Sequence, residues 1–501
     1  MNTTLPTLEK IAIKQSTTKA SERRIDTLPQ LLLIVPKTKR AHVADSVPYA
    51  DALNTRLSRG GWSKTPSHAV VELPNERATR VVVGFVDKEV DAFARQAAAR
   101  KLVAAARFES ATAMTVLIDG VQGASAWAEA VVLAAGAASF ELANFKQKKT
   151  PRKPLKQIEF LALPARHDFA HTLAAVHGNN LARWLSALPP NALTPAKYRR
   201  YIAQLAKRYG WQVETMGEVA LAKKGCGAFL AVVQGSPDRD AALVRVKYRP
   251  KKSTQRTLAL VGKGLCYDTG GVNVKPARYM FGMHEDMLGS SVALGTLLAL
   301  TELEAPFAVD CWLALAQNHI GPDAYKPNDV VTACDGTTIE VVHTDAEGRM
   351  VLADTLALVR KSKPALAIDF ATLTGSCVAA LGTRYSGVFT NDDALHEPLI
   401  AAGKASGERV WPFPQDADYD KALDSDVADI KQCSLENDAD HILAARFLSR
   451  FIGKDVPWVH VDLSAGNTKG GLGAVPTEST GFGVRFTLEA LLGPRSILSA
   501  K

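Results

Sequence analysis

The 501-residue sequence lacks the long apolar runs of a membrane protein. A membrane helix needs about 18 or more consecutive apolar residues, and the most apolar segment, AWAEAVVLAAGAASF, is short and contains Glu129. The first residues also lack the apolar core of a secretory signal. We therefore expect a cytoplasmic protein with no membrane partner.

Cysteine is also scarce, with six residues, and none of them stands in a Cys-x-x-Cys pair. Disulfide scaffolds and zinc ribbons need closely spaced cysteines, so this spacing favours reduced thiols in a cytosol. The chain contains no P-loop, no His-Glu-x-x-His and no Gly-x-Ser-x-Gly motif. The familiar signatures of nucleotide-binding proteins, zincins and serine hydrolases are therefore excluded.

Positive charge is concentrated in the first part of the chain. Residues 1–200 carry 29 Lys and Arg against 16 Asp and Glu, whereas residues 201–501 carry 31 against 35. The segment FKQKKTPRKPLKQ (145–157) contains six cations and two prolines, which predicts an exposed loop. Nucleic acid is one partner for such a surface, because Lys and Arg neutralise phosphates. The alternative is a solvated basic surface, since no DNA-reading motif is present.

Alternating strand and helix patterns predict an α/β fold in two parts. We expect a smaller N-terminal α/β domain over residues 1–166, followed by a larger α/β domain over residues 167–501. A mixed sheet flanked by helices is expected in the larger domain, because its strand patterns are almost continuously apolar. The predicted strands are 31–36, 80–86, 114–120, 157–164, 228–234, 257–262, 307–316, 365–373 and 458–463, with helices including 88–108 and 124–146.

The segment HTDAEGRM (343–350) places three charged side chains at alternate positions. A hairpin pattern around Asp335-Gly336 precedes it, and a helical pattern follows it. In extended backbone, Asp345, Glu347 and Arg349 would point the same way and converge. Considered alone, this segment has a simpler alternative, a solvated loop with a surface ion pair.

Two further segments add charged residues at strand ends or helix starts. One is VGKGLCYDTGGVNVKP (261–276), and the other is MHEDMLGSS (283–291). Ligands of open α/β sheets bind beyond the carboxyl ends of the strands. Converging carboxylates repel one another unless cations join them, and two divalent ions about 3.5–4 Å apart polarise a carbonyl and activate a water. The candidate residues are Lys263, Asp268, Lys275, Asp286, Asp345, Glu347 and Arg349.

These three segments resemble the signature of the leucyl aminopeptidase family, the two-metal cytosolic aminopeptidases. The flanking segments LPPNALTP, GAFLAVVQGS, DFATLTG and GFGVR agree, and the resemblance covers roughly residues 170–490. It implies hydrolysis of the N-terminal residue from peptides by a two-metal-activated water. It also implies two Mn²⁺ or Zn²⁺ ions per subunit, a bound bicarbonate and a homohexamer.

The resemblance also implies roles for individual residues. Lys275 would bind the developing oxyanion, and Arg349 would hold the bicarbonate that acts as general base. The pocket for the N-terminal side chain would contain Met283, Thr372 and Gly375, although Met283 also suits a plain core position. The implied metal ligands are Lys263, Asp268, Asp286, Asp345 and Glu347.

Three positions depart from the family pattern. His343 stands where Asn is usual, Leu288 where Gly is usual, and Gln317 where Glu is usual. His343 is interpreted as a metal ligand, a hydrogen-bonding group of the loop or a packing residue. Leu288 is interpreted as a residue that narrows the cleft or tightens the start of a helix. The alternative to an enzyme is a catalytically weak relative that acts as a DNA-binding or structural protein.

Overall fold

The structure is a computed structural model that describes residues 3–8, 10–107, 112–148, 153–252, 254–436 and 438–498. Residues 149–152 of the predicted basic loop lie outside these ranges. The chain forms two compact units. The larger unit contains Met1–Thr7, His177–Lys469 and Ser479–Lys501, and the smaller contains Leu8–Val176 and Gly470–Glu478. The domain boundary between residues 166 and 167 remains a prediction.

The smaller unit contains a six-stranded sheet in the order β1-β6-β5-β2-β4-β3. Of its strands, β3 alone runs antiparallel to its neighbour. Apolar clusters lie on both sides of this sheet, which explains the unbroken apolar runs of its central strands. The strands are β1 (Ala12–Gln15), β2 (Gln30–Pro36), β3 (His68–Glu72), β4 (Arg80–Val86), β5 (Ala113–Ile118) and β6 (Gln157–Leu161).

Helices α1 to α4 lie in the smaller unit, where the two long ones, α3 and α4, pack against each other. Helix α3 begins later than predicted, because the Asp91 carboxylate caps it by accepting a hydrogen bond from Ala94 N at 2.7 Å. The helices are α1 (Glu22–Ile25), α2 (Ala50–Ser58), α3 (Ala92–Ala106) and α4 (Ala124–Ser139).

The larger unit is built on an eight-stranded mixed sheet in the order β15-β14-β17-β13-β9-β10-β8-β7. The four central strands, β17, β13, β9 and β10, are mutually parallel. The predicted α/β class with a mixed sheet flanked by helices is confirmed. The strands are β7 (Gln212–Gly217), β8 (Ala242–Tyr248), β9 (Thr254–Asp268), β10 (Phe307–Asn318), β13 (Leu366–Ala371), β14 (Ser386–Thr390), β15 (Val410–Pro412) and β17 (Trp458–Asp462).

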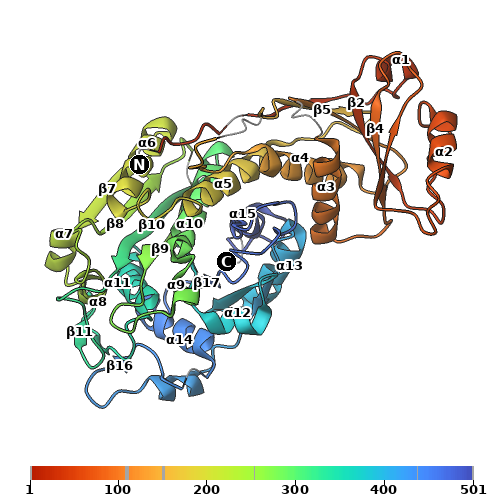
Figure 1. Ribbon diagram of the computed structural model, residues 1–501. Coiled ribbons are helices and arrows are strands. Elements are labelled where there is room, and N and C mark those ends of the chain that lie inside the picture. The colour runs from red at the N-terminus through yellow and green to blue at the C-terminus, as the bar shows by residue number, and fades with distance from the viewer. Residues whose placement is uncertain are drawn as a thin grey trace. The chain divides into compact units, whose positions relative to one another are not determined.

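Helices cover both faces of this sheet (Figure 1). On one face α10 packs on β9, β10 and β13 beside α15, and on the other α11 packs on β9 beside α8 and α14. Helix α5 (Ala170–Ser186) begins in the smaller unit and ends in the larger one. The other helices are α6 (Pro195–Tyr209), α7 (Glu218–Lys223), α8 (Gly227–Val233), α9 (Ala277–Met280), α10 (Leu288–Glu302), α11 (Glu347–Lys361), α12 (Gly375–Leu381), α13 (His396–Ser406), α14 (Asp440–Ile452) and α15 (Val484–Leu492).

The segment predicted as a strand at 228–234 is helix α8 instead. Most of its residues are buried, including Phe229, because it packs against α11 as well as β10. A short apolar run buried on nearly all sides has no visible period, so a strand and a helix cannot be distinguished from its sequence.

A small sheet of β11 (Val330–Thr332), β12 (Thr338–Glu340) and β16 (Ile430–Lys431) precedes α11. The strands β11 and β12 form the predicted antiparallel hairpin, with Gly336 at a φ of 97° in its turn. Within the described ranges, no helix combines the length and apolar character needed to cross a membrane.

Candidate active site

The candidate site lies where the central parallel strands of the larger unit end. Strand β9 carries Lys263 and ends at Asp268. The chain then reverses through Gly270 and Gly271, whose φ angles of 87° and 68° favour glycine, and returns with Lys275. The predicted position at the carboxyl ends of the strands is confirmed.

Hydrogen bonds join this returning loop to the segment before α11. Asn273 N donates to Thr344 Oγ1 at 2.9 Å, and Thr344 N donates to Asn273 Oδ1 at 2.9 Å. This pairing brings Lys275 beside Asp345, so that two segments about 70 residues apart meet in one site.

Helices α10 and α11 place the other acids. Asp286 lies between a 3-10 turn (Met283–Glu285) and α10, and Glu347 is the first residue of α11. The start of α10 packs closely on β13, because a Cβ on Gly289 would lie 2.0 Å from Phe370 O. A Cβ on Gly348 would lie 2.6 Å from Lys263 Cε, so the glycine after Glu347 makes room for the lysine.

All ten predicted site residues line one cavity of about 580 Å³ in the larger unit. Lys263, Asp268 and Glu347 are almost completely buried, and Asp345 is half-buried. The ten residues are Lys263, Asp268, Lys275, Met283, Asp286, Asp345, Glu347, Arg349, Thr372 and Gly375.

Two lysines pair with the four carboxylates. Lys263 Nζ lies 2.8 Å from Asp286 Oδ1 and 2.9 Å from Glu347 Oε1. Lys275 Nζ lies 2.8 Å from Asp268 Oδ2 and 2.5 Å from Asp345 Oδ1. The two ammonium groups therefore reduce the repulsion among four neighbouring acids.

The carboxylates retain capacity for further cations. Asp286 Oδ2 and Glu347 Oε2 are buried and accept no hydrogen bond. One oxygen from each of Asp268, Asp286 and Glu347 lies within 4.8 Å of the others. Carboxylate oxygens are good ligands for Mn²⁺, Zn²⁺ and Mg²⁺, so the residues fit divalent metal binding.

Burial perturbs the titration of these groups. It raises the pKa of Asp286 to about 7, and it also raises the pKa values of Asp345 and Glu347. Burial opposes the charged form of Lys263, but the carboxylates of Asp286 and Glu347 outweigh it and raise the Lys263 pKa above its ordinary value. The attraction of the neighbouring carboxylates therefore outweighs the cost of burying the Lys263 ammonium group.

Asp345, Glu347 and Arg349 line the same cavity, but the extended backbone predicted for them is wrong. Helix α11 already begins at Glu347, so side chains two residues apart point in widely different directions. Arg349 lines the same cavity, but its Nη2 donates to both Asp440 carboxylate oxygens, at 2.8 and 2.9 Å. Its Nη1 donates to Gln432 O at 3.0 Å.

The three departures from the family pattern have different surroundings. The ring nitrogen Nδ1 of His343 accepts from Asp345 N at 3.2 Å, which is the predicted loop hydrogen bond. Leu288 is buried and lines the cavity. Gln317 Oε1 accepts from His319 Nε2 at 3.0 Å when that nitrogen is protonated.

Residues that the sequence did not single out for the site also contribute. Asn318 Nδ2 donates to Asp268 Oδ1 at 2.9 Å and to Thr344 O at 3.0 Å. Asp462, at the end of β17, accepts from Thr374 Oγ1 at 2.6 Å and so holds the loop after β13. The position of Asp462 at the end of an apolar strand was the available signal, whereas no pattern pointed to Asn318 as a partner of Asp268.

Residues 180–488 match the family model described as "Cytosol aminopeptidase family, catalytic domain". This chain belongs to the cytosol aminopeptidase family. The sequence resemblance is therefore confirmed, together with the expected metal-dependent aminopeptidase activity of an α/β enzyme. No observation supports the alternative of a catalytically weak DNA-binding or structural relative.

Whole-chain comparisons agree with this membership. A probable cytosol aminopeptidase of Stutzerimonas stutzeri (strain A1501) is 36% identical over 479 residues, covering 91% of this chain and 95% of that protein. One from Parasynechococcus marenigrum (strain WH8102) is 38% identical over 406 residues, covering 80% and 82%. The solved structure of the bottromycin maturation enzyme BotP in complex with Mn is 32% identical, with a TM-score of 0.80, and covers 93% of this chain and 100% of that one.

Proposed function

We propose that this aminopeptidase removes the N-terminal residue of peptides by using two divalent cations, with Mn²⁺ as the working metal. The observation that carries the proposal is the buried carboxylate cluster, in which Asp286 Oδ2 and Glu347 Oε2 have no hydrogen-bond partner. Neighbouring carboxylates that are buried together repel one another, so they need cations to remain ionised. The Mn-bound structural relative supports manganese, and zinc is the alternative.

The metal ligands in this proposal are five of the ten predicted site residues that line the cavity. When bound, two divalent ions would activate a water and polarise the scissile carbonyl. Lys263 would have to give up its proton to act as a ligand, because only the neutral amine has a free electron pair. The five ligands are Lys263, Asp268, Asp286, Asp345 and Glu347.

Lys275 has the proposed role of oxyanion donor. Its Nζ is already held between Asp268 and Asp345, so the ammonium is oriented before substrate arrives. Preorganised donors of this kind contribute about 3–4 kcal/mol to transition-state stabilisation. For Arg349 we propose the binding of bicarbonate, with Asp440 fixing the guanidinium that would hold it.

The proposed pocket for the N-terminal side chain is the part of the cavity formed by Met283, Thr372 and Gly375. The Thr372 hydroxyl donates to Asp286 Oδ1 at 2.7 Å, so this wall is tied to a predicted metal ligand. Leu288 lines the same cavity and narrows it relative to a glycine. We expect this position to influence which N-terminal residues are accepted.

We further propose a homohexamer that acts in the cytoplasm on peptide substrates, as the resemblance implies. The basic first part of the chain leaves nucleic acid as a second partner to test. Light scattering coupled to size-exclusion chromatography measures the assembly, and a mass other than six chains contradicts the hexamer.

Metal removal and replacement tests the central proposal. Chelation should abolish peptidase activity, and adding Mn²⁺ back should restore it with two ions per chain by elemental analysis. Parallel additions of Zn²⁺ and Mg²⁺ identify the working metal. Full activity in a verified metal-free sample would show that the proposal is wrong, and one ion per chain at full activity would refute the two-metal part.

A further inference from the structure

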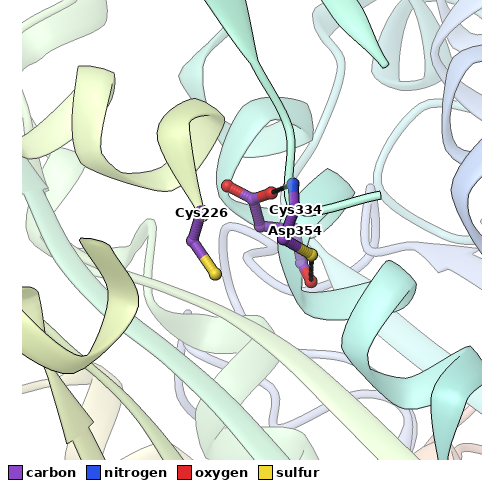
Figure 2. Close-up of side chains that lie close together, drawn as sticks. All are labelled: Cys226, Cys334 and Asp354. Atoms are coloured by element: carbon purple, nitrogen blue, oxygen red, sulfur yellow. Dashed lines mark hydrogen bonds between the residues drawn. The ribbon is translucent and has the colours of Figure 1, made fainter. Parts of the chain in front are cut away.

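A second group of donor atoms lies outside the cavity, in the larger unit. It consists of Cys226, Cys334 and Asp354, whose donor atoms all lie within 4.8 Å of one another. Figure 2 shows the three side chains together. Cys226 precedes α8, Cys334 lies in the hairpin turn between β11 and β12, and Asp354 lies on α11. Three separate elements therefore meet at these atoms.

The Asp354 carboxylate is completely buried. Its Oδ2 accepts from Phe229 N at 2.7 Å, and its Oδ1 accepts from Cys334 N at 2.7 Å. Among the described residues no lysine, arginine or histidine forms an ion pair with it. Each oxygen has a further lone pair for a cation. Asp354 is therefore a fixed donor with negative charge that the two amides only partly offset.

The Sγ atoms of the two cysteines lie within 4.8 Å of each other. Cys226 is completely buried, whereas Cys334 is partly exposed and its Sγ–H donates to Asp354 O at 3.5 Å. Hydrogen bonding with Cys226, together with burial, raises the pKa of the Cys334 thiol. A bound metal ion would stabilise both cysteines as thiolates.

The spacing suits a small thiophilic ion. Zinc–sulfur bonds are about 2.3 Å, so two sulfurs on a tetrahedral ion lie about 3.8 Å apart. Donor atoms within 4.8 Å need to approach by about 1 Å at most. Cys334 is the side chain with room to move, because it borders an open depression of about 630 Å³ with Gly225 and Gly336. Water from this depression would be able to supply a fourth ligand to an ion bound here.

We propose that Cys226, Cys334 and Asp354 form a second metal site, which binds one thiophilic divalent cation of the zinc class. Two thiolates and a carboxylate select zinc-like ions over Mn²⁺ and Mg²⁺, which prefer oxygen ligands. Binding releases the two thiol protons to solvent and leaves the three elements joined through one ion. Asp354 stands seven residues after Glu347 on α11, about 10 Å along the helix axis, so the site is separate from the peptidase cavity.

Cadmium titration of the full-length chain tests this site. The protein is first saturated with Mn²⁺, which occupies the oxygen-rich cavity and has low affinity for thiolates. Adding Cd²⁺ should then produce thiolate-to-cadmium absorption in the ultraviolet that saturates at one equivalent per chain. An excess of Zn²⁺ should remove the absorption by competition. No thiolate absorption in the wild-type chain overturns the proposal, whatever the variants do.

Variants then locate the signal. Cys226→Ser and Cys334→Ser should each lose the absorption and keep peptidase activity within about twofold, which also reports correct folding. Cys311→Ala removes a buried thiol of β10 outside the cluster and should keep the absorption. Retention of the full signal in both serine variants overturns the proposal, and so does a Cys226–Cys334 disulfide in the freshly reduced protein.

Discussion

The carboxyl ends of parallel strands bear acidic residues in both units, but their surroundings differ. In the smaller unit Asp87 follows β4, and its side chain is 67% exposed at 3.6 Å from Lys37 Nζ. In the larger unit Asp268 is the last residue of β9. Its side chain is 2% exposed and lies 2.8 Å from Lys275 Nζ. The same sheet edge therefore carries a solvated ion pair in one unit and a buried cluster in the other.

The difference shows that strand order alone does not create a site. Water screens an exposed pair, which contributes about 0–1 kcal/mol to stability. Buried acids have no such screening, so they need either protons or cations. The loops after β9 and before α11 cover this edge of the larger unit and place its acidic residues in a buried cluster, which fits the metal binding proposed above.

The largest expected effect separates the two edges directly. Glu347→Gln should reduce peptidase activity to background and lower the bound metal, because it removes a buried ligand charge. Asp87→Asn in the smaller unit should change neither, since surface substitutions cost under about 0.5 kcal/mol. Assays and elemental analysis on both variants measure this, and a metal-replete, active Glu347→Gln protein contradicts it.

Lys275 should affect rate more than metal content. Lys275→Ala removes an oxyanion donor, so kcat should fall by roughly 10²–10³ while Mn²⁺ remains bound. Lys275→Arg keeps the charge and should recover part of the rate. If kcat is unchanged in the alanine variant, the proposed role of Lys275 is wrong.

Metal affinity should depend on pH with a definite sign. The pKa of Asp286 is about 7, so the ionised carboxylate that binds a cation appears only as pH rises through that value. Lys263 must also release a proton, and its pKa is raised. For each proton that is released on binding, the metal affinity falls about tenfold when the pH drops by one unit. The affinity should therefore fall roughly 100-fold or more from pH 8 to pH 6.

Calorimetry of Mn²⁺ binding in buffers with different ionisation heats counts the protons released. A pH-independent affinity with no proton release would be inconsistent with Asp286 and Lys263 as ligands. The exposed pair of Asp87 and Lys37 in the smaller unit should contribute nothing to the proton release that accompanies Mn²⁺ binding.

Asn318→Ala should have a smaller effect than loss of a ligand. Asn318 supports Asp268 from outside the cluster, and groups that orient metal ligands typically contribute 10–100-fold to metal affinity. The neighbouring Gln317→Ala is the matched control, because Gln317 contacts His319 and not a ligand. Equal affinities in the two variants would remove the supporting role.

The smallest effect is expected at the basic loop of the smaller unit. Lys148 and Lys153 are exposed on either side of residues 149–152. A variant in which Lys148, Lys149, Arg152 and Lys153 are all replaced by neutral residues should keep peptidase activity near wild type. If the chain binds nucleic acid, this variant should bind more weakly with a flatter salt dependence. Gel-shift titrations at two salt concentrations decide this, and no wild-type shift at low salt excludes nucleic acid.

Much of the site was predictable because its residues follow apolar strands or open apolar helices. Asp268 ends a strand, Asp286 precedes a helix and Asp345 follows a hairpin, and each position is visible as a break in hydrophobic periodicity. The family signature added the roles. The direction of Arg349 was not predictable, because it depends on where α11 begins and on Asp440, 91 residues later.

Other features depend on contacts that no local pattern contains. The buried helix α8 has no periodicity to distinguish it from a strand, and its neighbours decide its form. Cys226, Cys334 and Asp354 form no local sequence motif, so their proximity could not be predicted from the sequence. Long-range packing, and not residue type, determines these parts of the molecule.

The two lysines among the four acids also bear on how this protein is made. Each of Lys263 and Lys275 bridges two carboxylates, so the metal-free chain carries its own counterions at the centre of the site. A newly synthesised chain can then close around the cluster before any metal arrives. We therefore expect metal loading to exchange cations within a folded protein, so that the supply of metal determines when activity begins.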